Sequence, residues 1–148
     1  MPVWSFKYSR DALSESDKVD LAKDITQLYI NVGLPAFYVN VQFFEMGPTE
    51  MFIGGETRPN SVSLSIAHVA RTFESEAIRF EFLKKIDLIL ERLIKKDLDL
   101  EYFIVDSLRQ QWKIHGMYPP STGSDEEKEW VRLNRPVEHN RAYTLPLV

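Results

Sequence analysis

The chain contains no cysteine, and this absence removes several kinds of chemistry. Disulfide frameworks, thiolate catalysis and zinc sites built on sulfur are all excluded. The three histidines, His68, His115 and His139, lie far apart and show no metal-ligand spacing. The pair Gly54-Gly55 lacks the fuller glycine pattern of a phosphate-binding loop. We therefore expect no metal site and no cofactor.

Long apolar runs and an excess of basic residues are also missing. No run approaches the ~20 apolar residues of a membrane span, and the amino-terminal segment lacks the basic and apolar regions of a signal peptide. The 18 Lys and Arg residues against 22 Asp and Glu residues give a net charge of −4, which argues against binding to a phosphate backbone. We therefore expect a cytoplasmic protein that binds neither membranes nor nucleic acids.

The length of 148 residues is typical of one domain with one hydrophobic core. Beyond Gly116 the composition changes, and a loop rich in proline and glycine precedes a short helix that we expect at 124–134. We expect a single domain over residues 1–148, with its core at about 2–116 and a C-terminal extension at about 117–148.

Hydrophobic periodicity predicts four strands and two long helices. Strands are indicated by alternating or β-branched and aromatic residues, and helices by apolar residues three or four positions apart. The elements are expected, in chain order, as a strand at 3–8, a helix at 14–32, strands at 38–46 and 61–70, a helix at 75–96 and a strand at 100–105. This β-α-β-β-α-β order contains two βαβ units. It predicts an α+β fold, in which a four-stranded sheet carries two helices on one face and a short C-terminal helix follows.

The chain begins with Met1 and Pro2. The small second residue favours removal of the initiator, which would leave the secondary amine of Pro2 as the amino terminus. Such an amine accepts a proton near neutral pH if burial and a nearby cation lower its pKa. If Met1 stays, the Pro2 nitrogen is an amide with no basicity. Many proteins begin with Met-Pro and have no catalytic amine, so a catalytic role for Pro2 depends on the rest of the chain.

A proline that opens an apolar strand, in a β-α-β-β-α-β chain of this length, resembles the tautomerase superfamily. Members of that superfamily hold the proline at the floor of a pocket. Over about residues 2–116 the chain is similar to the cis-3-chloroacrylic acid dehalogenase-like branch. The matching pieces follow the proline-led strand in order: Asp24-Ile25-Thr26, Val41-Gln42-Phe43, Phe52-Ile53-Gly54-Gly55, the strand leading into Arg71, and Gln110-Gln111 followed by Gly116.

The resemblance implies roles for five residues around a pocket. Arg71 falls where the family carries a carboxylate-binding arginine, whose guanidinium would also favour the neutral form of the Pro2 amine. Tyr29 would donate to the carbonyl oxygen, although a tyrosine on the apolar side of a helix is more often a core residue. Phe103 and Trp112 would line the pocket, and Trp112 is equally consistent with packing or a subunit contact.

Four positions depart from the dehalogenase pattern. Its histidine, second arginine, tyrosine and water-activating glutamate are replaced here by Tyr29, Glu74, Phe103 and Ile114. An isoleucine cannot activate water, so these replacements argue against dehalogenation. The remaining groups suit keto-enol tautomerisation of a small 2-keto acid. Pro2 would remove a proton beside the carbonyl and return it to another atom, while Arg71 holds the carboxylate and the developing enolate charge.

Other functions stay open from the sequence. A hydratase or decarboxylase acting on small unsaturated acids would use Pro2 as a general acid, and an oligomer could keep the tautomerase scaffold with an idle proline. The same element order describes an RNA-recognition domain, but residues 61–70 (SVSLSIAHVA) lack the aromatic and basic residues that stack bases. The resemblance also implies a homotrimer whose sheets pack around a threefold axis, with a small carboxylate as substrate.

Overall fold

A four-stranded sheet forms the centre of the molecule. The structure is a computed structural model that describes residues 1–69, 73 and 75–138. Along the sheet, the strands follow the order β2 (Asn40–Met46), β1 (Val3–Ser9), β5 (Ser61–His68) and β6 (Asp99–Asp106). β1 runs parallel to β2 and antiparallel to β5, and β5 runs parallel to β6. Two βαβ units therefore meet at the central β1–β5 pair.

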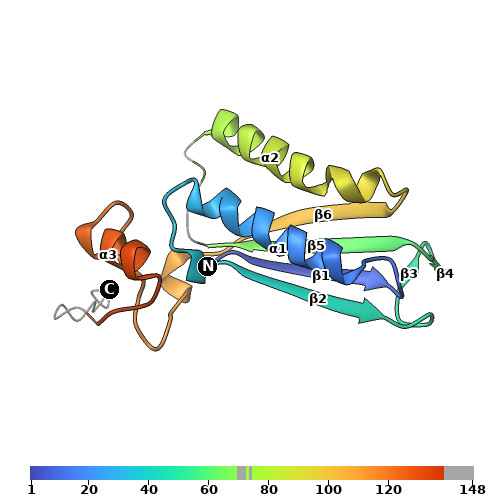
Figure 1. The fold of residues 1–148 in the computed structure, drawn as a ribbon, viewed down its shortest axis with the longest axis horizontal. Helices are drawn as coiled ribbons and strands as arrows, with labels where there is room; N and C mark the ends of the chain where they lie inside the picture. The colour runs from blue at the N-terminus through green and yellow to red at the C-terminus, as the bar shows by residue number, and fades with distance from the viewer. Residues whose placement is uncertain (70–72, 74, 139–148) are drawn as a thin grey trace.

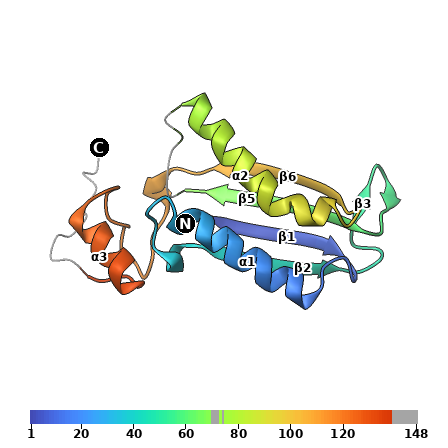
Figure 2. The ribbon, with the colours of Figure 1, turned by 45° about the horizontal axis from the view of Figure 1, so that its top comes forward.

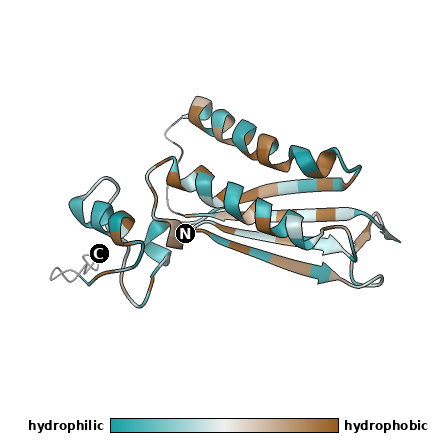
Figure 3. Cartoon of the chain, viewed as in Figure 1, coloured by the Kyte–Doolittle hydropathy of each residue, from teal (hydrophilic) through white to brown (hydrophobic). Residues whose placement is uncertain are grey.

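Two long helices cover one face of this sheet (Figure 1, Figure 2). α1 (Glu15–Ile30) connects β1 to β2, and α2 (Glu76–Ile94) connects β5 to β6. Hydrophilic and hydrophobic residues alternate along both helices (Figure 3), as expected for elements with one face on a core and one in water. A short helix, α3 (Asp125–Leu133), follows. The predicted α+β fold is confirmed.

The core lies between the sheet and the two helices. Trp4, Phe6 and Tyr8 alternate along β1, and each side chain is almost fully buried. Buried side chains from β5, α1 and α2 pack in the same core cluster: Val62, Leu64, Ile66, Leu21, Ile25, Ile86 and Leu90. The serines between the apolar residues of β5 occupy the other face of the strand, because successive strand residues point to opposite faces. The alternation predicted for this strand is confirmed over its described residues.

Two apolar residues within the predicted range of the first helix are exposed. Val19 is 51% exposed, because it lies on the outer side of α1, and Val32 is 43% exposed in the turn that follows the helix. The same holds at the start of α2, where Ile78 is 48% exposed. Single exposed apolar residues of this kind are common on protein surfaces.

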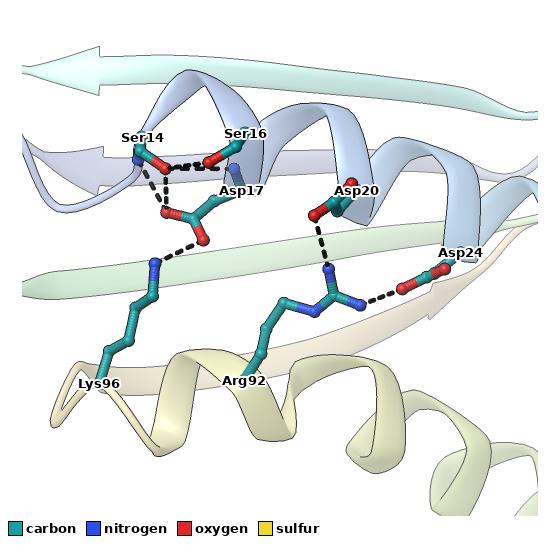
Figure 4. A network of polar contacts seen from close by, with 7 residues as sticks. All are labelled: Ser14, Ser16, Asp17, Asp20, Asp24, Arg92 and Lys96. Atoms are coloured by element: carbon teal, nitrogen blue, oxygen red, sulfur yellow. Dashed lines mark hydrogen bonds and ion pairs between the residues drawn. The ribbon is translucent and has the colours of Figure 1, made fainter.

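A capping box starts α1. The Ser14 hydroxyl accepts a hydrogen bond from the Asp17 backbone N–H at 3.2 Å, and the Asp17 carboxylate accepts one from the Ser14 N–H at 2.9 Å. Lys96, in the turn after α2, contacts the same carboxylate, and its Nζ lies 2.5 Å from Asp17 Oδ1 (Figure 4). Arg92 of α2 also pairs with two further carboxylates of α1. These contacts fix the two helices relative to each other on the sheet.

Replacing Asp17 with asparagine is expected to lower the free energy of unfolding by about 1–2 kcal/mol at pH 7, because the cap weakens and the pair with Lys96 loses its charge. Burial raises the pKa of the Asp17 carboxyl, but hydrogen bonds from Lys96 and Ser14 outweigh this effect and lower it to about 2. An unfolded aspartate has a pKa of about 3.9. The stabilisation is therefore present above that pH and is lost as the pH falls through the folded pKa.

Urea unfolding of the wild type and Asp17→Asn at pH 7 and in the acid range checks this expectation. The two stabilities should converge in acid, and a difference that stays constant with pH would contradict it. Glu15→Gln is a suitable control, because Glu15 pairs with Lys18 from a side chain that is 90% exposed. It should change the stability by less than about 0.5 kcal/mol.

A small hairpin follows β2 and was not predicted as one. β3 (Phe52–Ile53) pairs antiparallel with β4 (Glu56–Thr57), and Gly54 and Gly55 form the turn with φ values of 64° and 85°. Glycine adopts such positive φ values without a steric cost. The sequence indicates only a short apolar piece here, because strands of two residues show no measurable alternation.

The C-terminal extension packs on the segment before β2 through four aromatic rings. Phe37 and Tyr38 come from a 3-10 turn, η1 (Ala36–Tyr38), Trp112 follows β6, and Trp130 belongs to α3. The Tyr38 ring lies edge-on to Trp112 at 4.8 Å and to Trp130 at 6.1 Å. We call Phe37, Tyr38, Trp112 and Trp130 the aromatic cluster. It attaches α3 to the end of the sheet where the chain begins (Figure 1).

Candidate active site

Pro2 is buried at the amino end of β1, in the middle of the sheet. Its carbonyl oxygen accepts a hydrogen bond from the Asn40 N–H at 3.0 Å, at the start of β2. On the other side, Val3 pairs with Ala67, so Pro2 lies beside the end of β5 where His68 is buried. The N-terminus therefore lies at the end of the sheet on which α3 and the aromatic cluster pack (Figure 1, Figure 2).

The surroundings of the amino terminus oppose a positive charge there. Burial, and then the charge of Arg109, lower the pKa of the Met1 amine to about 3. Both effects disfavour the protonated form of any amine at this position. Removal of Met1 would leave the Pro2 amine one residue further into the same surroundings. Burial and a nearby cation are therefore both present at the amino terminus.

Tyr29 lies in the core on the helix side of the sheet, with 1% of its surface exposed. Its hydroxyl oxygen accepts a hydrogen bond from the Trp4 indole N–H at 3.0 Å, and its ring is 6.2 Å from that of His68. Burial raises the pKa of the Tyr29 phenol, although the bond from Trp4 acts in the opposite direction. The phenol is therefore neutral and still carries its proton.

Phe103 and Trp112 lie in different surroundings. Phe103 pairs with Ser65 in the sheet, and Ser65 pairs with Ser5, so the three share the face opposite to Trp4 and the helices. Phe103 is 53% exposed there, whereas Trp112 is 6% exposed within the aromatic cluster. Within one chain, the structure brings Trp112 to the same end of the molecule as Pro2 and leaves Phe103 on the open face of the sheet.

Phe103 also borders a hollow of about 370 Å³ between α2 and β6. The other residues that line this hollow are Phe73, Arg79, Leu83, Tyr102, Ile104 and Asp106. Arg71 and Glu74, which the resemblance places at the pocket, lie outside the residues that the structure describes. Among residues 1–69, 73 and 75–138, no three His, Asp or Glu side chains come together as metal ligands. No helix within these ranges is long and apolar enough to cross a membrane.

Arg109 is a residue that the sequence does not single out. It belongs to η2 (Arg109–Gln111), a 3-10 turn that follows β6 and lies beside the N-terminus in both ribbon views (Figure 1, Figure 2). Its guanidinium donates to the Thr122 hydroxyl at 3.1 Å and to the carbonyl oxygens of Pro119 and Pro120. Only the folding of the loop after Gly116 creates this arrangement, so no local pattern marks Arg109 as part of a site.

The chain matches the family Tautomerase_3, described as "Putative oxalocrotonate tautomerase enzyme", over residues 1–135. It therefore belongs to this family, within the tautomerase superfamily. This membership confirms the resemblance that begins with the proline-led strand and the two βαβ units. No curated protein is similar enough to the chain to count as a match.

Solved structures share the fold, and three of them illustrate the similarity to this chain. A probable enzyme from the thermophilic fungus Aspergillus fumigatus is 48% identical, with a TM-score of 0.91 over 94% of this chain and 98% of that one. RhCC from Rhodococcus jostii RHA1 is 32% identical, with a TM-score of 0.87 over 93% of this chain and 99% of that one. N1, a member of the cis-3-chloroacrylic acid dehalogenase family, is 17% identical, with a TM-score of 0.68 over 86% and 89%. The likeness to N1 is one of fold alone.

Proposed function

We propose that this protein is a tautomerase in which the amine of Pro2, freed by removal of Met1, acts as the general base on a small 2-keto acid. The observation that carries the proposal is the buried amino terminus beside Arg109, where burial and that cation lower the pKa of the Met1 amine and would act in the same direction on a Pro2 amine. Membership of the tautomerase family supports the same assignment. A base with a lowered pKa is unprotonated at neutral pH and ready to accept a proton.

In the proposed reaction, the Pro2 nitrogen takes a proton from the carbon beside the carbonyl group. The electron pair of the broken C–H bond moves into the new C=C bond, and the carbonyl oxygen becomes an enolate. Return of the proton from Pro2 to that oxygen gives the enol. Arg71 holds the substrate carboxylate and stabilises the enolate charge in this scheme. Tyr29, which keeps its own proton, is the candidate donor to the carbonyl oxygen, and Trp112 and Phe103 are candidate apolar contacts.

A hydratase or decarboxylase with Pro2 as general acid is the second candidate. It would need a protonated Pro2 amine at neutral pH. Burial and the Arg109 charge both act against protonation of the terminal amine, so the described surroundings favour the base over the acid. Ile114, at the position of the water-activating glutamate of the dehalogenases, also argues against hydration.

Two measurements on the same sample test the proposal. The intact mass shows whether Met1 has been removed, and a steady-state assay follows enolisation of phenylpyruvate by the wild type and by Pro2→Ala. A processed terminus together with activity that depends on Pro2 supports the tautomerase. Retention of Met1, or equal rates for the two proteins, would leave a tautomerase scaffold with an idle proline.

We propose further that the active form is a homotrimer. The sheet face opposite the helices carries small serines in its centre, at Ser5, Ser63 and Ser65, and exposes Phe44 and Phe103 on the outer strands. An exposed sheet face with large apolar residues is typical of an interface between subunits. Sedimentation should therefore give three times the 17.3 kDa mass of the chain. A monomer at micromolar concentration would contradict the trimer.

A further inference from the structure

Arg109 is held in place by uncharged oxygens. Its three hydrogen-bond acceptors are the Thr122 hydroxyl and the carbonyl groups of Pro119 and Pro120, and both prolines are buried. None of these acceptors carries a negative charge, and no ion pair to Arg109 forms within the described residues. By contrast, Arg79 and Arg92 each pair with carboxylates. No partner among the described residues therefore neutralises the charge of the half-buried Arg109 guanidinium.

This charge acts on the amino terminus. Arg109 is the one charged side chain of the described residues that contributes to the lowered pKa of the Met1 amine. Two other titratable side chains, Tyr29 and His68, are buried at the same end of β1. A guanidinium without a carboxylate partner, fixed near a neutral amine, is arranged to accept an anion that binds between them.

We propose that Arg109 is an anion-binding residue of the active site, which takes the carboxylate of a small acid and holds it next to the Pro2 amine. The inference rests on the proposed function for the identity of the acid, a 2-keto acid. It also offers a replacement for an arginine that this chain lacks, because Glu74 occupies the position of the second arginine of the dehalogenases. Arg109 would supply that second cation from a different segment of the chain, in addition to Arg71.

The test compares Arg109→Gln and Arg109→Lys with the wild type, and Arg132→Gln serves as control. Arg132 lies on the exposed side of α3, where it pairs with Glu129. Loss of the Arg109 charge should raise the titration midpoint of the Pro2 amine by about one pH unit. The ¹⁵N chemical shift of Pro2 measures this midpoint. The same loss should also raise KM for phenylpyruvate roughly tenfold. Arg109→Lys keeps the charge, so the titration midpoint of the Pro2 amine should stay close to the wild-type value, while most of the affinity for phenylpyruvate is lost. Arg132→Gln should change neither the midpoint nor KM.

A measurement on the wild type completes the test without depending on activity or on the folding of a variant. Addition of 3-phenylpropionate, an unreactive carboxylate, should shift the Nε resonance of Arg109. No shift of this resonance would overturn the inference, as would an Arg109→Gln protein that folds with an unchanged KM. If Pro2→Ala abolishes activity while Arg109→Gln does not alter KM, the tautomerase stands and Arg109 has no part in binding. If the wild type lacks activity but the resonance shifts, the anion site stands alone.

Discussion

Replacing Pro2 with alanine is expected to lower kcat/KM for phenylpyruvate enolisation by at least about 100-fold, the lower end of what a positioned general base contributes. Alanine is also small enough to allow removal of Met1, so the variant still begins with a free amine. That amine is primary and rotates about its bond to the chain, whereas the proline ring fixes the direction of its nitrogen. A base that is not held in a reactive geometry loses most of its effect.

A second variant separates the amine from the proline ring. A chain with an uncleaved residue before Pro2 keeps the ring but turns its nitrogen into an amide, which has no basicity. It should lose activity at least as completely as Pro2→Ala. Far-UV circular dichroism should match the wild type in both variants, since the backbone carbonyl of residue 2 still accepts the bond from the Asn40 N–H. Full activity in the extended chain would show that the Pro2 nitrogen is not the base.

The fold is well predicted where the sequence pattern has a local cause. The alternation of residues 61–68 places its apolar side chains on one face, because a strand can only alternate in this way. The pair Ser14 and Asp17 identifies the start of α1, since a capping box consists of those residue types at that spacing. Val19 belongs to α1, as the predicted range of the helix implies, but its exposure could not be predicted, because a list of apolar residues does not show on which side of the helix each one lies.

The candidate site is less well predicted, because it depends on contacts between distant segments. Pro2 is identified by its position in the chain and by the family resemblance. Arg109 is near the terminus only because the loop through Pro119 and Thr122 folds back on it. Nothing in the residues around Arg109 indicates this approach. The face on which Phe103 lies likewise follows from its register with Ser65, which the sequence does not determine.

The C-terminal extension contacts the βαβ units, and replacing residues in this contact shows how far the stability of the fold depends on it. Trp130 of α3 is 1% exposed, and its ring lies 5.8 Å from that of Phe37. Its indole N–H donates to the Val137 carbonyl at 3.0 Å. The Phe37 N–H in turn donates to the Asn134 side chain at 2.9 Å. Tyr38, next in the chain, precedes the strand whose first residue bonds to Pro2, so the aromatic cluster links α3 to the candidate active site.

Replacing Trp130 with alanine is expected to lower the free energy of unfolding by about 3–5 kcal/mol, because it removes a buried ring of the aromatic cluster and leaves a cavity. Trp130→Phe, which keeps an aromatic ring and loses the bond to Val137, should lose less. Val131→Ala, at a neighbouring residue that is 40% exposed, should cost under about 1 kcal/mol. Urea unfolding should be followed by fluorescence and by far-UV circular dichroism. A single transition, shifted equally in both signals, means that α3 and the sheet unfold together. If the unfolding transition of the sheet does not shift, the extension is a separate unit and does not stabilise the surroundings of Pro2.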